Sequence, residues 1–221
     1  MTVTVLVVML VVTLFFLTLS RLAVEHVERS HYGQRVDFFR KYPVFEKDIV
    51  FLGDSITDGG CWEELFPGIP LKNRGINADT TTGVLKRLDE ILANKPRAIF
   101  ILIGTNDLPW FEYRSDDDIL KTYNDILAYC KINSPATQVF VQSILPRKKN
   151  FSKRIQGLNI HLQKLAEKFG YTFINLFPSF VGAQGELKKE LTNDSLHLMA
   201  DGYAIWVENL KPYIEKLQQS S

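Results

Sequence analysis

The chain lacks the residues that would mark several common classes of protein. Its 221 residues include only two cysteines, Cys61 and Cys130, which excludes a disulfide framework, and no histidine lies near them at zinc-site spacing. The 26 basic and 25 acidic residues give a net charge of +1, so no overall field favours nucleic acid as a partner. Phosphate-binding and dinucleotide-binding glycine motifs are also missing. We therefore expect a globular protein without a metal, a cofactor or a nucleic-acid partner.

The first twenty residues lack charge altogether. Residues 3–19 are almost wholly valine, leucine, phenylalanine and threonine. About 20 residues at 1.5 Å each span roughly 30 Å, the thickness of a bilayer core. No basic residue precedes this segment and no convincing cleavage site follows it, so we favour a single transmembrane anchor over residues 1–20. The alternative is a cleaved signal peptide, which would make the protein secreted.

The side of the membrane on which the rest of the chain lies stays open. Several arginines and lysines follow the apolar segment and none precedes it, which favours a cytoplasmic domain by the positive-inside rule. Residues 21–43 are a polar, partly helical neck that Pro43 is expected to end. Residues 44–221 then form one domain, whose size and 46% hydrophobic composition suit a single core.

Within this domain, strand-like and helix-like segments alternate. The expected strands are Asp48–Leu52, Leu71–Asn73, Ala98–Ile103, Gln138–Ser143 and Thr172–Asn175. The expected helices are Thr81–Asn94, Asp116–Ile132, Ser152–Phe169 and Ala200–Leu217. Such alternation predicts an α/β fold with a parallel, doubly wound sheet. In these sheets the ligand site lies outside the carboxyl ends of the strands, so the loops that follow the strands are the ones to inspect.

A serine stands directly after the first expected strand. The sequence Gly53-Asp54-Ser55-Ile56-Thr57 breaks the apolar run, and Asp54 or Ser55 is placed to cap a helix that starts there. A hydroxyl at this edge of the sheet is well placed for a nucleophile. Because an unassisted serine is a poor nucleophile, it needs a base within hydrogen-bond reach.

The best candidate for that base is His197. The other three histidines lie in the neck or in the middle of an expected helix, whereas His197 follows Asp194 by three residues in a loop before the last helix. This spacing lets Asp194 accept a hydrogen bond from Nδ1 and leaves Nε2 free to face Ser55. The alternative role for Asp194 is a turn or helix cap.

Two further loops supply hydrogen-bond donors at the same edge. Gly75 follows the second expected strand and Asn106, within Gly104-Thr105-Asn106-Asp107, follows the third. With the backbone N–H of Ser55, the N–H of Gly75 and the side-chain amide of Asn106 would form an oxyanion hole. Taken alone, Gly75 or Asn106 is equally well explained as a turn residue.

These four blocks resemble those of the SGNH, or GDSL-type, hydrolases, and they stand in the order of that family. The resemblance covers most of the chain from Asp48 onward. It implies a three-layer α/β/α flavodoxin-like sandwich around a central parallel sheet. It also implies a serine esterase that needs no cofactor, with Ser55 as nucleophile, His197 as base and acid, and Asp194 as the residue that orients His197.

Within that family, the sequence around residues 73–81 is most similar to the branch of platelet-activating-factor acetylhydrolase-like and carbohydrate acetylesterase-like proteins. That resemblance implies a short acyl group, commonly acetyl, on a small-molecule, carbohydrate or lipid ester. Related branches leave open a lysophospholipase, a thioesterase or an acyltransferase that works at the membrane. A non-catalytic binding domain would have lost at least one of the four blocks, and all are present.

Four aromatic residues are candidates for the substrate pocket. Trp110, Phe111 and Tyr113 come just after Asn106 and are expected to form an apolar or sugar-stacking wall, or simply to cover the end of the sheet. Trp62 lies shortly after Ser55 and is a candidate to line the same pocket. The basic sequence Arg147-Lys148-Lys149 follows the fourth expected strand. It is either a solvated loop or a contact for an anionic substrate or lipid head group.

Overall fold

The computed structural model describes residues 3–108 and 114–219 and is built around one parallel sheet. Its strands are β1 (Ile49–Gly53), β2 (Leu71–Gly75), β3 (Ala98–Leu102), β4 (Gln138–Gln142) and β5 (Thr172–Ile174). Their order across the sheet is β2-β1-β3-β4-β5, and all neighbouring pairs are parallel. This is the flavodoxin-like order, and its topological switch point lies between β1 and β3. The sheet confirms the predicted α/β class and three-layer fold.

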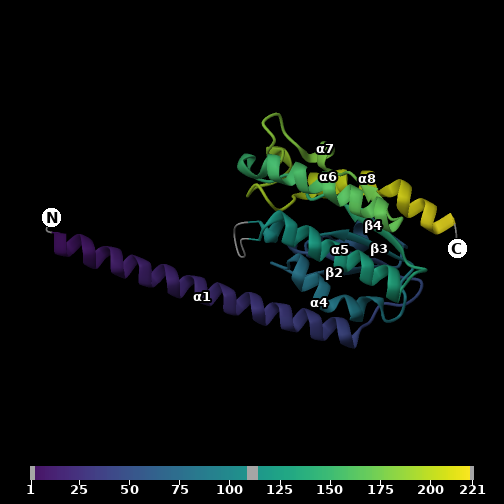
Figure 1. Cartoon of the computed structure of the whole chain (residues 1–221), viewed down its shortest axis with the longest axis horizontal. Coiled ribbons are helices and arrows are strands. Elements are labelled where there is room, and N and C mark those ends of the chain that lie inside the picture. The colour runs from purple at the N-terminus through teal and green to yellow at the C-terminus, as the bar shows by residue number, and fades with distance from the viewer. Residues whose placement is uncertain (1–2, 109–113, 220–221) are drawn as a thin grey trace.

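Longer helices cover both faces of the sheet (Figure 1). They are α4 (Thr81–Leu92), α5 (Asp116–Asn133), α6 (Ser152–Phe169) and α8 (Ala200–Gln219), and each lies within two residues of its expected bounds. Alternate residues of each strand face opposite layers, because side chains in a strand point to opposite sides. Val50 and Leu52 join the core under α4, α5 and α6, whereas Ile49 and Phe51 join the core that includes α8.

Short helical segments fill the loops at the ends of the strands. They are α2 (Ser55–Asp58), α3 (Trp62–Leu65) and α7 (Phe177–Phe180), with 3-10 turns at Thr105–Asp107, Lys149–Phe151 and Lys189–Leu191. Of these, the sequence indicated only the helix that starts at Ser55. The others are too short for a helical period to show in the sequence.

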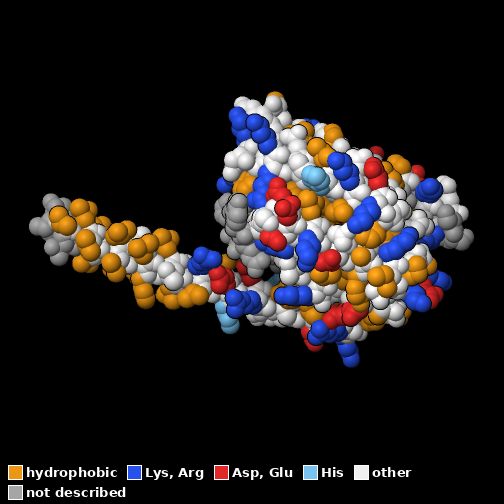
Figure 2. Space-filling model, in the orientation of Figure 1, with side chains coloured by type: hydrophobic (Ala, Val, Ile, Leu, Met, Phe, Trp, Pro, Cys, Tyr) orange, Lys and Arg blue, Asp and Glu red, His pale blue; other side chains and the backbone are white. Residues whose placement is uncertain are grey.

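The N-terminal segment forms one continuous helix, α1 (Val3–Lys41). Its first part projects from the domain with its apolar side chains exposed (Figures 1 and 2). Its last part packs on the domain through Val36 and Phe39, which contact Ile76, and through the hydroxyl of Tyr32, which donates to the carbonyl of Gly83. The segments expected as anchor and neck thus form one helix, which ends at Lys41, two residues before Pro43.

Candidate functional site

The serine at residue 55 is held at the carboxyl end of β1, an interior strand of the sheet. Gly53 ends the strand, and Asp54 accepts a hydrogen bond from the N–H of Ile56 through Oδ1 at 3.0 Å, which caps α2. Gly53 fits here because a Cβ would lie 2.2 Å from the carbonyl oxygen of Leu102. The strand therefore turns sharply into α2 and leaves the side chain of Ser55 at the rim.

Ser55, His197 and Asp194 form one hydrogen-bonded chain. The Oγ of Ser55 lies 2.9 Å from Nε2 of His197, and Nδ1 of His197 lies 2.6 Å from Oδ2 of Asp194. An imidazole that donates from Nδ1 to a carboxylate presents an unprotonated Nε2 to the hydroxyl. This geometry is suited to removing a proton from Ser55 when its oxygen attacks a carbonyl carbon.

The loop that carries Asp194 fixes its carboxylate. Oδ1 of Asp194 accepts from the backbone N–H groups of Leu196 and His197, at 2.9 and 2.8 Å. Ser195 adopts a left-handed backbone conformation (φ 67°), which turns the chain tightly enough for these bonds. Desolvation raises the pKa of Asp194, but the hydrogen bonds from His197 and Leu196 outweigh it and bring the pKa to about 2. The carboxylate is therefore ionised at neutral pH.

These residues open into a cavity of about 490 Å³. Its walls come from loops after β1, β2, β3 and β4, from the loop before α8, and from α1. The lining residues are Glu28, Ser55, Asn77, Ala78, Asn106, Arg147, Lys148, Asp194, Ser195, Leu196 and His197. The structure thus brings Ser55, Asn106, Asp194 and His197 to one cavity.

Asn106 presents a side-chain amide to this cavity from the 3-10 turn after β3. Gly104 reaches φ 121° just before it, a conformation that glycine adopts readily. Nδ2 of Asn106 donates to the carbonyl of Asp79 at 3.0 Å, which fixes the amide plane. Because Nδ2 carries two hydrogens, a second N–H remains for a group in the cavity.

Gly75 does not take the place that the sequence suggested. Its N–H donates to Oδ1 of Asn73 at 2.8 Å, and Gly75 is not among the cavity-lining residues. A glycine is needed there for packing, since a Cβ would lie 2.2 Å from the backbone nitrogen of Asp58. The expected contribution of Gly75 to an oxyanion hole is therefore wrong in this structure.

Asn77 and Ala78 are the residues of this loop that reach the cavity, and sequence reasoning missed both. Ala78 is the more informative of the two. Ala78 has φ 58°, a left-handed conformation that alanine adopts only at a cost of about 1–2 kcal/mol. Asp79, the next residue, is buried and pairs with Arg87 at 2.8 Å, which fixes the end of the loop. A strained residue beside Ser55 and Asn106 is the signal that identifies this position, and only the structure contains it.

Of the four aromatic candidates, the structure describes only Trp62, and it does not line the cavity. Trp62 is buried against Phe51 and Trp206, and its Nε1 donates to the carbonyl of Thr57 at 2.9 Å, so it is a core residue. The prediction that Trp62 lines the pocket is wrong, because α3 turns the side chain toward the sheet. Trp110, Phe111 and Tyr113 lie outside the described residues.

Asp54 is fully buried directly beneath Ser55. Burial raises the pKa of its carboxyl to about 7, despite the hydrogen bond from Ile56, and the nearby Asp79 and Asp107 raise it further. Oδ2 of Asp54 has no hydrogen-bond partner among the described residues. The residue next to the serine is thus a carboxyl group that titrates near neutral pH.

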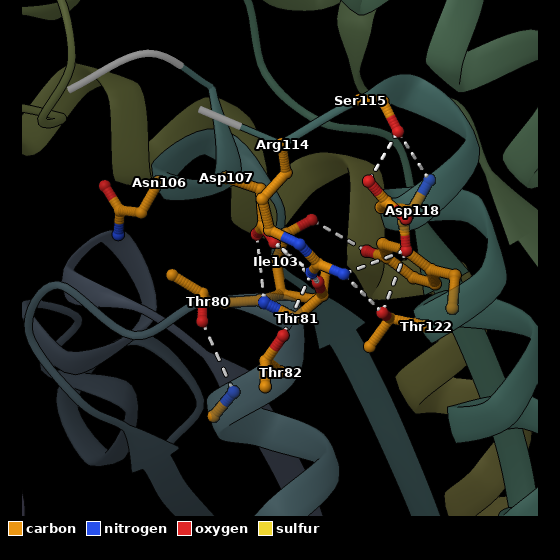
Figure 3. Close-up of polar contacts among 12 residues, drawn as sticks. Thr80, Thr81, Thr82, Ile103, Asn106, Asp107, Arg114, Ser115, Asp118 and Thr122 are labelled. Atoms are coloured by element: carbon orange, nitrogen blue, oxygen red, sulfur yellow. Dashed lines mark hydrogen bonds and ion pairs between the residues drawn. The ribbon is translucent and has the colours of Figure 1, made fainter. Parts of the chain in front are cut away.

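A polar network braces the loop that carries Asn106 (Figure 3). Asp107 is fully buried and accepts from the N–H and the hydroxyl of Thr81, at 2.9 and 2.6 Å. Arg114 pairs with Asp107 at 2.9 Å and also donates to the hydroxyls of Thr82 and Thr122. The network joins the loop after β3 to the N-terminus of α4 and to α5.

Over the described ranges, no cluster of three or more histidine, cysteine, aspartate or glutamate side chains could hold a metal ion. Cys61 is exposed, Cys130 is buried, and both are free thiols. The chemistry that the described residues support is nucleophilic attack by a hydroxyl, with proton transfer through an imidazole.

Comparisons with known proteins agree with this geometry. A model of the GDSL-like lipase/acylhydrolase family matches residues 51–205. Subunit alpha2 of platelet-activating factor acetylhydrolase IB from Rattus norvegicus is 29% identical over 187 residues, which cover 79% of this chain and 77% of that protein.

Two solved structures have the same fold. A protein from Streptococcus pneumoniae superposes with a TM-score of 0.79 and is 28% identical, covering 89% of this chain and 99% of its own. A GDSL-like lipase from Bacteroides thetaiotaomicron has a TM-score of 0.74 and 26% identity, covering 83% and 97%. The family match spans more than half of the chain and includes Ser55, Asn106, Asp194 and His197. The chain belongs to the GDSL-like lipase/acylhydrolase family and is a serine ester hydrolase.

Proposed function

We propose that Ser55, His197 and Asp194 act as a catalytic triad that releases a short acyl group, commonly acetyl, from an ester. The observation that carries this proposal is the chain of contacts from the Oγ of Ser55 through His197 to Asp194, at 2.9 and 2.6 Å. The low pKa of Asp194 keeps the carboxylate ionised, so that it can orient His197 and stabilise the imidazolium that forms.

The reaction proceeds in two steps. The Oγ of Ser55 attacks the ester carbonyl as Nε2 of His197 takes its proton, and His197 returns that proton to the departing alcohol. Water then attacks the acyl-enzyme with the same base and releases the acid. In both steps the second N–H of Asn106 and the backbone N–H groups of Ser55 and Ala78 are the proposed donors to the oxyanion.

The preference for a short acyl group has two supports. The cavity of about 490 Å³ is at the small end of the range for ligand pockets and is lined largely by polar and charged residues. The relative from Rattus norvegicus is a subunit of an enzyme named for the removal of an acetyl group. A long acyl chain would need an apolar channel, and Ala78 and Leu196 are the only apolar residues among the lining residues that the structure describes.

We also propose that α1 anchors the enzyme in a membrane. Its apolar window has a mean hydropathy of 2.5 and is exposed along its whole length, so nothing in the described chain covers it. The hydroxyls of Thr13 and Thr18 donate to the carbonyls of Met9 and Leu14, which satisfies them within the helix, as a lipid environment requires. The helix continues unbroken past Ser20 into the part that packs on the domain.

The test is hydrolysis of p-nitrophenyl esters, from acetate to long chains, by the full chain in detergent. We expect activity to be highest with acetate or butyrate and to fall at least 10³-fold in Ser55→Ala and His197→Ala. Ser30→Ala and His161→Ala are matched controls on exposed helix positions and should retain full activity. A preference for long chains would favour a lysophospholipase or thioesterase, and full activity in Ser55→Ala would contradict the proposed mechanism.

A further inference from the structure

The helix that carries the apolar segment also forms one wall of the active-site cavity. Glu28 of α1 lines the same cavity as Ser55 and His197. Farther along α1, Arg35 pairs with Asp58 of α2 at 2.9 Å, and Arg40 pairs with Glu90 of α4. Because α2 begins with Ser55, the helix is attached directly to the element that holds the nucleophile.

The cavity opens on the side of the domain from which α1 projects. The loops at the carboxyl ends of the strands, the start of α5 and the turn before α6 all lie toward the free part of α1 (Figure 1). Basic side chains lie on this side of the domain as well (Figure 2). Lys148 is exposed and lines the cavity, and Lys149 and Lys153, also exposed, line the hollow beside it. A membrane surface that carries anionic lipids would attract such a rim.

The continuous helix sets the distance between the membrane and the site. Arg21 is the first charged residue after the apolar segment, and Glu28 follows it by seven residues. Seven residues at 1.5 Å each place Glu28 about 10 Å beyond the edge of the hydrocarbon. The polar layer of a bilayer is about 5–8 Å thick on each side, so the wall of the cavity at Glu28 lies just beyond its outer edge.

We propose that the enzyme hydrolyses short-acyl esters carried on the polar head groups of membrane-held molecules, and that α1 fixes the height at which it reaches them. This inference rests on the proposed esterase activity and anchor. The acyl esters of a glycerolipid lie at the hydrocarbon boundary, about 10 Å below the cavity, so a lipid would have to be lifted to present them. An ester on the outer part of a head group is already close to the height of the cavity.

The test uses the full chain in lipid bilayer nanodiscs and a fluorogenic coumarin acetate tethered to a dialkyl phospholipid. Ethylene-glycol spacers of increasing length place the acetate from the hydrocarbon boundary outward. We expect the parent to hydrolyse the acetate at least ten-fold faster at a height of about 10 Å than at the boundary. Equal rates at all heights would overturn the inference without the need for any variant.

A longer helix should move this preference. A second copy of the sequence Leu22–Glu28 inserted after Arg21 adds about 10 Å and two turns, so the same face of α1 still meets the domain to within about 20°. We expect the insertion variant to lose at least ten-fold on the spacers that suit the parent and to retain activity on longer ones. An unchanged spacer profile would contradict the inference.

Untethered coumarin acetate separates the two proposals. The parent and the insertion variant should hydrolyse it at the same rate, because the catalytic residues are unchanged. If Ser55→Ala also hydrolyses it at that rate, the proposed function fails. If the parent is active and needs Ser55 but shows no dependence on spacer length, only the inference about membrane height fails. A seven-residue Ala-Glu-Lys helix at the same insertion point should give the same profile, which excludes an effect of the copied side chains.

Discussion

Asp54 illustrates how one residue can link the site to the stability of the fold. It caps α2 through Oδ1 and is fully buried, and burial raises its pKa to about 7 from an ordinary value of 3.8. The folded state therefore binds a proton more tightly than the unfolded state does. Between about pH 4 and pH 7, the free energy of unfolding should fall as the pH rises.

We predict that Asp54→Asn removes this dependence while keeping the cap. Asparagine retains an oxygen that can accept from the N–H of Ile56 and cannot ionise. Relative to the parent, the variant should gain up to about 1.4 kcal/mol of unfolding free energy per pH unit over this range, and the gain should level off above pH 7. Urea unfolding at several pH values measures this difference. If the free energy of unfolding changes with pH in the same way in both proteins, the account of Asp54 as a buried carboxyl group is contradicted.

Ala78 and Gly75 form a matched pair of tests for the loop after β2. Ala78→Gly relieves the left-handed strain at φ 58° and should stabilise the fold by about 0.5–1 kcal/mol with activity kept within two-fold. Gly75→Ala places a Cβ 2.2 Å from the nitrogen of Asp58 and should destabilise by about 1–3 kcal/mol. Thermal unfolding distinguishes the two variants. If Gly75→Ala stabilises the protein, the close packing of residue 75 against Asp58 is contradicted.

Among the site residues, some positions could be predicted from the sequence and others could not. Ser55, Asn106, Asp194 and His197 stand in loops at the carboxyl ends of strands or next to a helix start, so the strand pattern alone brings them to one edge. Gly75 was misassigned because a glycine needed for backbone packing and a glycine that frees an N–H look alike in sequence. Only the backbone angle of Ala78 and its place in the cavity distinguish the two positions.

At the scale of elements, the loop after β3 depends on a side chain that comes from the start of α5. Arg114 ties the buried Asp107 to α4 and α5 and thereby fixes the turn that holds Asn106 (Figure 3). The sequence shows Gly-Thr-Asn-Asp, but it does not show that Arg114 is the partner of the buried aspartate. That pairing depends on how two helices converge at this loop.

We predict that Arg114→Ala destabilises the protein by about 2–4 kcal/mol. The loss of one partner leaves the Asp107 carboxylate buried with only the Thr81 donors, and the partial exposure of Arg114 keeps the effect below that of a fully buried pair. Arg114→Lys keeps the charge but loses the forked donors. Its free energy of unfolding should therefore lie between those of the parent and of Arg114→Ala. Urea unfolding measures the stability of both variants. Their kcat should also fall, because Asp107 fixes the turn that holds its neighbour Asn106. If Arg114→Ala leaves the free energy of unfolding and kcat unchanged, the network does not hold the loop in place.

At the scale of the whole molecule, the strand and helix pattern was enough to predict the parallel sheet and its layers. The apolar periods are strong where strands are buried on both faces, as in β1 and β3. The pattern did not predict that the apolar segment and the neck form one helix or that Glu28 reaches the active-site cavity. Those features depend on the packing of α1 against the loops beside α2. This packing is between parts of the chain that are distant in sequence.

The central claim is that Ser55 is a nucleophile activated by His197. The most direct measurement is labelling of the full chain with a fluorophosphonate, followed by mass spectrometry of the intact protein and its peptides. We predict one phosphonyl group per chain, located on Ser55, with no labelling of Ser55→Ala and labelling at least 10²-fold slower in His197→Ala. Labelling at another residue, or equal labelling of Ser55→Ala, would contradict the account.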